Sequence, residues 1–289
     1  MKKKAPVFIA APRSRSTALF TLAAPWAEQY YGLISLGQNT EFFNEFSWMN
    51  YAHDMNTGHD NRMEYFPVNS KRGLSHHYVY PPFLNNKLER NHHKIRVLQH
   101  EQKQGRNYNV KIMTDNFFSQ RNGGWWIDEE LLDFYSNRKM VITRRKDLKG
   151  LAFSLLLANT TGLWHRRNRN EADYERVKNG STYINPNLTS IIRRELESLK
   201  RLDRLEDIIQ GRGYPFFTFY YEDLKNIEDM SNALDMVYGN DEWRKTINQQ
   251  YLDAIMTKDM QIDYTTAIEN YEEVEKSVNM LIAEIIENG

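Results

Sequence analysis

The stretch VFIAAPRSRSTALF, residues Val7 to Phe20, carries the pattern that decides the fold. It opens with the apolar run Val7–Ala10, which predicts a buried strand of a parallel sheet. A short polar loop follows, and an apolar helical pattern begins at Ala18. Ser16 or Thr17 is expected to cap this helix. The sequence therefore predicts a strand, a tight turn and a helix in direct succession.

The loop and the start of the following helix predict an anion-binding site. The first N–H groups of a helix lack partners and carry partial positive charge. Arg13 adds a planar set of donors that fits a phosphate, and Ser14, Ser16 and Thr17 add hydroxyl groups. The alternative is an ordinary capped turn with an arginine on its surface. The GxxxxGK[ST] pattern of nucleotide-binding P-loops is absent, because no glycine occurs before Gly32.

Composition excludes several classes of protein. The chain has 289 residues with 38 basic and 38 acidic side chains, and this zero net charge argues against a nucleic-acid binder. Without cysteine it has no disulfide, thiolate metal site or cysteine nucleophile. The apolar run after MKKK is too short for a signal peptide, and Leu151–Ala158 is too short for a membrane span. We expect a cytoplasmic protein without nucleic-acid or membrane partners; a homodimer stays open.

Strands and helices alternate along residues 1–289, which predicts a single doubly wound α/β domain with a central parallel sheet and a helical C-terminus. Further strands are expected at 33–36, 110–113, 140–143 and 215–220, and helices at 17–31, 86–104, 128–136, 149–159 and 187–210. Pro25 is expected to kink or interrupt the first helix, and Gly123–Trp126 to form a turn. The segment 44–85 is expected to be an excursion from the α/β domain that carries substrate contacts, or else a structural lobe.

A second pattern, ITRRKDLKGLAFSLLLANTTGLWH, occupies Ile142 to His165. An arginine at the end of a strand and a serine inside the following helix can converge on one anion. Arg144 and Ser154 are expected to do so, and Arg145 is one residue closer to Ser154 in the sequence. The alternatives are ion pairs between the arginines and Asp147 or other carboxylates, and a bond from Ser154 to the carbonyl four residues back.

Together these segments resemble the PAPS-dependent sulfotransferase superfamily, where PAPS is 3′-phosphoadenosine 5′-phosphosulfate. The first loop resembles its phosphosulfate-binding loop, P-[KR]-S-G-[ST]-T, with Arg15 at the glycine position. The second segment resembles RRxDxxxQAxSLxxAxxTGxWH of the bacterial trehalose 2-sulfotransferase-type branch, with Leu151 in place of glutamine. Further matches in the same order are Glu41-Phe42-Phe43, Val110–Met113 and Tyr221-Glu222-Asp223-Leu224.

The resemblance implies a P-loop-like sulfotransferase fold and transfer of a sulfuryl group from PAPS to a hydroxyl of a carbohydrate or other small molecule. The donor-binding residues that it implies are Pro12, Arg13, Ser14, Arg15, Ser16, Thr17, Arg144 and Ser154. It also implies Arg13 and Glu41 as catalytic residues, Glu41 being the general base, and Glu41, Trp164 and His165 as acceptor contacts. Such a reaction requires no metal, and the histidines lack HExxH spacing.

Two other functions stay open. An ATP-dependent, kinase-like phosphotransferase is disfavoured by the missing P-loop lysine and metal-binding carboxylate. A nucleotide-binding protein of the same fold without activity is kept open by Arg15, because its side chain could crowd the phosphosulfate or strain a turn that needs positive φ. Glu222 and Asp223 are expected to be structural, capping the next helix and pairing with a basic residue.

Overall fold

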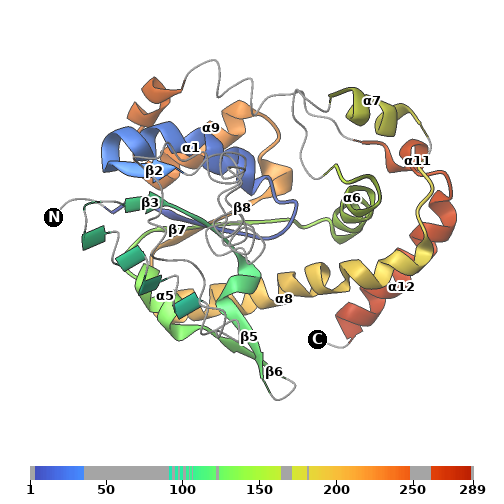
Figure 1. The fold of residues 1–289 in the computed structure, drawn as a ribbon, viewed down its shortest axis with the longest axis horizontal. Helices are drawn as coiled ribbons and strands as arrows, with labels where there is room; N and C mark the ends of the chain where they lie inside the picture. The colour runs from blue at the N-terminus through green and yellow to red at the C-terminus, as the bar shows by residue number, and fades with distance from the viewer. Residues whose placement is uncertain are drawn as a thin grey trace, which may run out of the picture.

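The structure is a computed structural model that describes residues 4–35, 91–92, 95–96, 98–99, 102–103, 105, 107–121, 124–163, 171–180, 182–247 and 262–287. Three predicted site residues, Glu41, Trp164 and His165, lie outside the described residues, as does the segment 44–85. The described residues contain both sequence patterns that predict anion binding, from β1 through α1 and from β7 through α6 (Figure 1).

Among the described residues, four parallel strands form the central sheet in the order β4–β1–β7–β8. They are β4 (Lys111–Met113), β1 (Val7–Ala10), β7 (Met140–Arg144) and β8 (Phe216–Tyr220). Ile9 at the centre lies opposite Ile112 on one side and Ile142 on the other. Every residue of β1 is buried, as expected for a strand covered on both faces. The predicted α/β class with a parallel sheet is confirmed.

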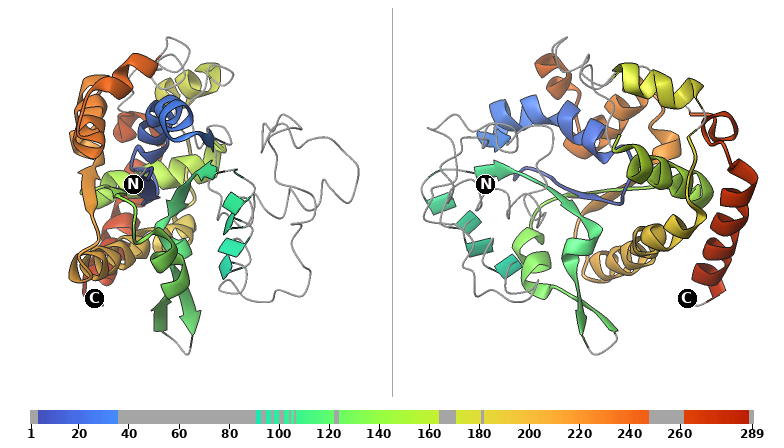
Figure 2. Two further views of the ribbon diagram at one scale, coloured as in Figure 1. Left: turned by 90° about the vertical axis from the view of Figure 1, so that its left-hand side faces the viewer. Right: turned by 45° about the vertical axis from the view of Figure 1, so that its right-hand side comes forward.

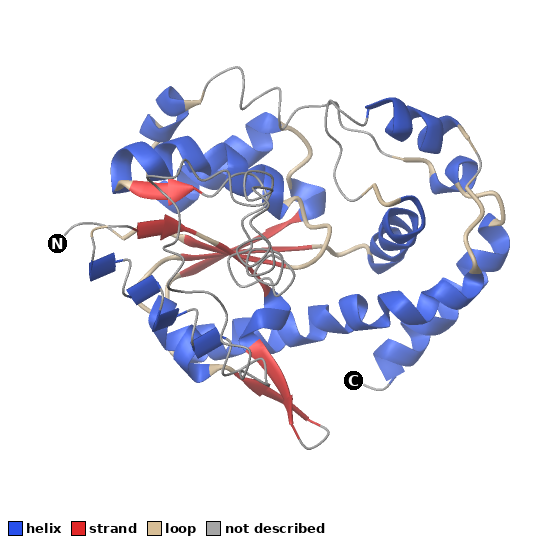
Figure 3. Cartoon of the chain, in the orientation of Figure 1, coloured by secondary structure: helices blue, strands red, loops and turns tan. Residues whose placement is uncertain are grey.

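Helices cover both faces of this sheet (Figure 3). One face carries α1 (Ser16–Tyr31) and α9 (Ile227–Tyr238); the other carries α5 (Glu129–Tyr135), α6 (Leu148–Thr161), α8 (Thr189–Gly211) and α12 (Tyr271–Glu287). Side chains alternate accordingly: Phe8 and Val141 pack with α1, whereas Ile9 and Ile142 pack with α8. The doubly wound arrangement is therefore also confirmed.

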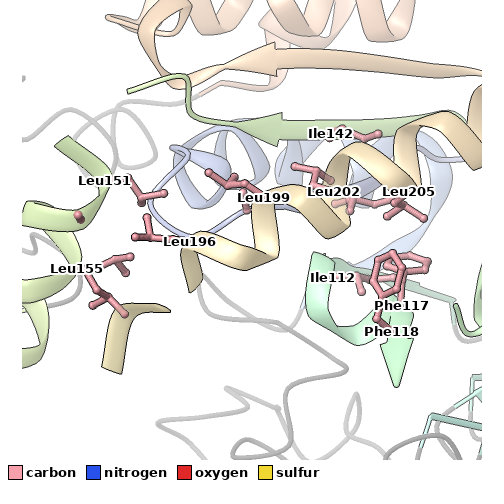
Figure 4. Packing of buried hydrophobic residues seen from close by; sticks show 14 of the residues in the cluster. Ile112, Phe117, Phe118, Ile142, Leu151, Leu155, Leu196, Leu199, Leu202 and Leu205 are labelled. Atoms are coloured by element: carbon pink, nitrogen blue, oxygen red, sulfur yellow. The ribbon is translucent and has the colours of Figure 1, made fainter. Parts of the chain in front are cut away.

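The larger core lies between the sheet and α8 (Figure 4). A stripe of buried leucines runs along the inner side of α8: Leu196, Leu199, Leu202 and Leu205. They pack in one cluster with Ile112 and Ile142 of the sheet and with Phe117. Each fully buried side chain of this kind stabilises the fold by roughly 1.5–3 kcal/mol. This packing fixes the end of β7 relative to α6 and α8.

The remaining elements lie outside the central sheet and the helices named above. They are β2 (Leu33–Ser35), β3 (Asn107–Asn109), η2 (Thr114–Phe117), β5 (Phe118–Arg121), β6 (Gly124–Ile127), α7 (Glu171–Asn179), η4 (Pro186–Leu188), η5 (Tyr221–Asp223), η6 (Glu242–Thr246) and α11 (Tyr264–Ala267). The turn expected at Gly123–Trp126 is wrong from Gly124 onward, because β6 pairs with β5 in a hairpin that projects from the body (Figure 2). Its two tryptophans favour a strand, and this pairing satisfies their backbone.

Two further expectations concern helices. α1 runs without interruption through Pro25, because its buried residues, among them Leu22 and Trp26, hold it against the sheet. The predicted helical C-terminus is confirmed by α11 and α12, which dock on α6 through Phe153, whose ring lies 5.3 Å from that of Tyr264 and 5.1 Å from that of Tyr271. In the part of the chain that the structure describes, no helix combines the length and apolarity that crossing a membrane requires.

Candidate functional site

The loop between β1 and α1 is a tight turn with two left-handed residues. Arg13 has φ 54° and Arg15 has φ 60°. This conformation costs roughly 1–2 kcal/mol for a residue other than glycine, and such strain clusters at functional sites. Between them, the buried Ser14 hydroxyl donates to the Ala11 carbonyl at 2.7 Å and lies 2.9 Å from the Thr143 hydroxyl. Ser14 therefore ties the loop to the ends of β1 and β7.

α1 begins without a side-chain cap. The cap position is Arg15 in the left-handed conformation, and Ser16 is already helical, so the prediction that Ser16 or Thr17 caps the helix is wrong. The left-handed residue turns the chain into the helix before either hydroxyl residue. The first turn of this fully described helix also carries no acidic side chain. Its leading N–H groups and partial positive charge are thus available in the manner of backbone anion sites.

The structure brings Arg13 and Ser154 together. Arg13 Nε donates to Ser154 Oγ at 2.7 Å, although 141 residues separate them in sequence. Ser154 lies on the buried side of α6, only 8% exposed. From β4, the Lys111 ammonium donates to the Thr17 hydroxyl at 2.8 Å. Two cationic side chains from different elements therefore lie beside the start of α1.

The structure does not bring Arg144 to Ser154. Arg144 Nη1 donates to Glu206 Oε2 at 2.7 Å, and Nη2 donates to Asp203, both on α8. Burial alone would lower the pKa of Arg144, but the bonds and charges of Asp203 and Glu206 raise it above its usual value. Strand alternation accounts for this placement, because Arg144 shares the face of Ile142, which packs toward α8.

Arg145, directly after β7, lies on the opposite side of the sheet from Arg144, near the loop between β1 and α1. Its guanidinium carbon lies 4.3 Å from the centre of the Tyr221 ring. The guanidinium carbon of Arg15 lies 4.4 Å from the same ring centre. Gly150 leaves room for this side chain, since a Cβ there would lie 2.5 Å from Arg145 Nη2. Gly150 is one helical turn before Ser154. The sequence analysis favours Arg144, and the residues before it do not separate it from Arg145, because β7 is buried on both faces and shows no alternation.

The Tyr221–Leu224 segment closes the other side of the loop. The Glu222 carboxylate accepts from the backbone N–H groups of Lys146 at 3.1 Å and Asp147 at 3.0 Å, at the start of α6. The expectation that Glu222 and Asp223 cap the next helix is wrong, because Asn226 caps α9 by accepting from Asp229 N. The expected basic partner is present: the Lys146 ammonium lies 3.5 Å from Asp223.

A small pocket with room for about one water molecule lies beside Arg13 and Ser154. Its other lining residues among those described are Leu157, Ala158, Thr161, Leu163, Val177 and Ile262. Ser154, Leu157, Ala158 and Thr161 follow helical spacing and so form one face of α6. The Thr161 hydroxyl donates to the Leu157 carbonyl at 2.6 Å, so this polar group is satisfied within the helix. The small pocket therefore has polar side chains at Arg13 and Ser154 and mostly apolar side chains elsewhere.

Within the described ranges, no group of three or more His, Asp or Glu side chains is placed to hold a metal ion. The predicted roles of Glu41, Trp164 and His165 stay predictions, because these residues lie outside the described part of the chain.

Comparisons with known proteins give one similarity. No protein-family model and no curated protein matches the chain. Among solved structures, the chain is similar to the crystal structure of sulfotransferase STF9 from Mycobacterium avium, with a TM-score of 0.44 and 11% identity over 100% of this chain and 77% of that chain. At this level of similarity, only the residues of the site bear on function.

Proposed function

We propose that this chain is a sulfotransferase that moves a sulfuryl group from PAPS to a hydroxyl of a small-molecule acceptor. The observation that carries the proposal is the 2.7 Å bond from Arg13 Nε to Ser154 Oγ. It joins the two segments whose sequences resemble the donor-binding segments of sulfotransferases. The start of α1, which has no side-chain cap, and the neighbouring Lys111 ammonium add positive potential at the same place.

The residues of the loop fit a phosphosulfate group. Arg15 adopts φ 60°, the conformation that glycine adopts freely, so its backbone can form the turn that glycine forms in the family motif. Its side chain leaves the loop, donates to the Leu224 carbonyl and packs on Tyr221. This arrangement leaves the start of α1 uncrowded by Arg15, and it favours an active enzyme over an inactive nucleotide-binding protein.

Bound PAPS would supply a sulfuryl group attached to a phosphate leaving group. The protein then contributes positioning and charge neutralisation. Arg13 and the start of α1 offset the negative charge that builds on the leaving phosphate as its bond to sulfur breaks. Glu41 accepts the proton of the acceptor hydroxyl as the new bond between sulfur and oxygen forms. Ser154 accepts from Arg13 Nε and so orients the guanidinium.

We assign the 3′-phosphate contact to Arg145 together with Ser154, in place of the predicted Arg144. The nucleotide that remains when PAPS loses its sulfuryl group is 3′,5′-ADP, which keeps the 3′-phosphate. Replacing Arg145 with alanine is expected to weaken binding of 3′,5′-ADP about tenfold or more, because a charge-assisted bond contributes roughly 1.5–3 kcal/mol. Arg144→Ala is the matched control, since its side chain lies on the other face of the sheet, where it pairs with Asp203 and Glu206 of α8. It should lower thermal stability and leave the affinity for 3′,5′-ADP within about threefold of wild type.

Titration calorimetry with 3′,5′-ADP and 5′-AMP checks both parts of this assignment. Wild-type protein should prefer 3′,5′-ADP, and the preference should shrink in Arg145→Ala. If Arg144→Ala loses the preference instead, the role returns to Arg144. Equal affinity of the wild type for the two nucleotides would contradict the donor assignment itself.

The acceptor stays a prediction at the level of its class. The sequence resemblance favours a carbohydrate. Incubation with sulfur-35-labelled PAPS and trehalose, octyl glucoside or 2-naphthol compares a sugar, an alkyl glycoside and a phenol, and a carbohydrate acceptor should be labelled faster than 2-naphthol. Binding of 3′,5′-ADP without transfer to any hydroxyl acceptor would favour the inactive alternative, and phosphoryl transfer from labelled ATP would favour the kinase-like one.

A further inference from the structure

We propose that Tyr221 is a positioning residue that links the anion-binding loop to the β7–α6 turn, an inference that rests on the proposed function. The ring of Tyr221 lies against two guanidinium groups that come from separate segments. The Arg15 guanidinium carbon lies 4.4 Å from its centre, and that of Arg145 lies 4.3 Å from it. One side chain therefore contacts both segments proposed to bind the donor.

Hydrogen bonds made by the segment Tyr221–Leu224 strengthen this link. Arg15 donates to the carbonyl of Leu224, whose side chain is 1% exposed and belongs to the core beneath α1 and α9. Glu222 accepts from the N–H groups of Lys146 and Asp147, where β7 passes into α6. The segment is thus anchored in the core and bonded to the anion-binding loop on one side and to the β7–α6 turn on the other.

The electrostatic arrangement explains why an aromatic ring suits this position. Both guanidinium groups carry a positive charge, and the negative face of the ring attracts each of them. Asp147, 3.6 Å from Arg145, and Glu222, 3.9 Å from it, add opposite charge. The ring therefore holds the Arg15 and Arg145 side chains against one common partner.

The link predicts how the donor site responds when the ring is removed. Tyr221→Leu fills part of the same space but has no aromatic face, so Arg15 and Arg145 lose their common partner. Its affinity for 3′,5′-ADP should fall about fivefold to tenfold. Tyr221→Phe keeps the face and loses only the hydroxyl, so its affinity should stay within about twofold of wild type.

Arg15→Gly gives an independent test that does not disturb the core. The substitution restores the family's usual residue and relieves the left-handed strain at Arg15, yet it removes the contacts to Tyr221 and Leu224. We expect it to weaken binding of 3′,5′-ADP about threefold to fivefold. The double variant Arg15→Gly with Tyr221→Leu should bind no more weakly than Tyr221→Leu alone, because the two residues act through one contact.

The matched control is Tyr220→Leu. Tyr220 is the neighbouring residue on β8, and its ring lies near Lys146 at 4.1 Å and Arg144 at 5.6 Å. Removing this ring should cost similar thermal stability and leave the affinity for 3′,5′-ADP within about twofold of wild type. A loss in Tyr220→Leu equal to that in Tyr221→Leu would show a merely structural effect and overturn the inference.

Calorimetry with 3′,5′-ADP and thermal unfolding of all five variants decide the outcome. Wild-type affinity in both Tyr221→Leu and Arg15→Gly would overturn the positioning role and leave the proposed function standing. If Tyr221→Leu does not fold, Arg15→Gly and Tyr221→Phe carry the test with the same expected values. If the wild type itself does not prefer 3′,5′-ADP over 5′-AMP, the proposed function fails first and the inference falls with it.

Discussion

Replacing Arg13 with alanine is expected to lower the rate of sulfuryl transfer by about 10²–10³-fold. Arg13 stands beside the start of α1, and its bond to Ser154 fixes the direction of the guanidinium. Negative charge on the leaving phosphate is larger in the transition state than in bound PAPS. The loss should therefore appear mainly in kcat, with a smaller change in the affinity for 3′,5′-ADP.

Two further variants sharpen the Arg13 prediction. Arg13→Lys keeps the charge but loses the planar donors and the Nε bond to Ser154, so its rate should lie between those of wild type and Arg13→Ala. Arg193→Ala is the control for loss of an arginine, because Arg193 pairs with Glu284 between α8 and α12. It should turn over at the wild-type rate. Near-normal transfer by Arg13→Ala would move the neutralising role to Lys111.

Much of the fold is predictable because local pattern and tertiary packing agree. β1 is an apolar run with turn residues behind it, and all of it is buried. The buried leucines of α8 recur at helical spacing, so the face that covers the sheet can be identified without coordinates. The hairpin of β5 and β6 is different, because its second strand depends on pairing with the first and lacks a clear periodic pattern of its own.

The candidate site likewise has one part that the sequence pattern predicts and another part that it does not. That the loop at Arg13 and the helix at Ser154 approach each other follows from two strand-end motifs on one edge of a parallel sheet. Which arginine of the 144–145 pair faces the loop depends on where the pleat of β7 ends, and a shift of one residue reverses the answer. The left-handed cap at Arg15 and its contact with Tyr221 depend on residues far apart in sequence, so no local pattern predicts them.

Replacing Glu41 with glutamine is expected to lower turnover by about 10²–10⁴-fold and to leave the affinity for 3′,5′-ADP nearly intact. The acceptor hydroxyl must lose its proton as its bond to sulfur forms, so a base has to lie within hydrogen-bond reach. Glutamine keeps the size and the hydrogen bonding of glutamate but cannot take the proton. Glu28→Gln, on the exposed side of α1, is the matched control and should not change the rate.

The pH dependence of kcat separates a base from a residue that only binds the acceptor. A carboxylate base acts in its ionised form, so wild-type kcat should fall when a low pH protonates the base, and this acidic limb should be absent from Glu41→Gln. A binding role would raise KM and leave the shape of the profile unchanged. Turnover of Glu41→Gln within a few-fold of wild type would move the proton transfer to His165. In that case His165→Gln should abolish the acidic limb, because a neutral imidazole and an ionised carboxylate both lose their basicity as the pH falls.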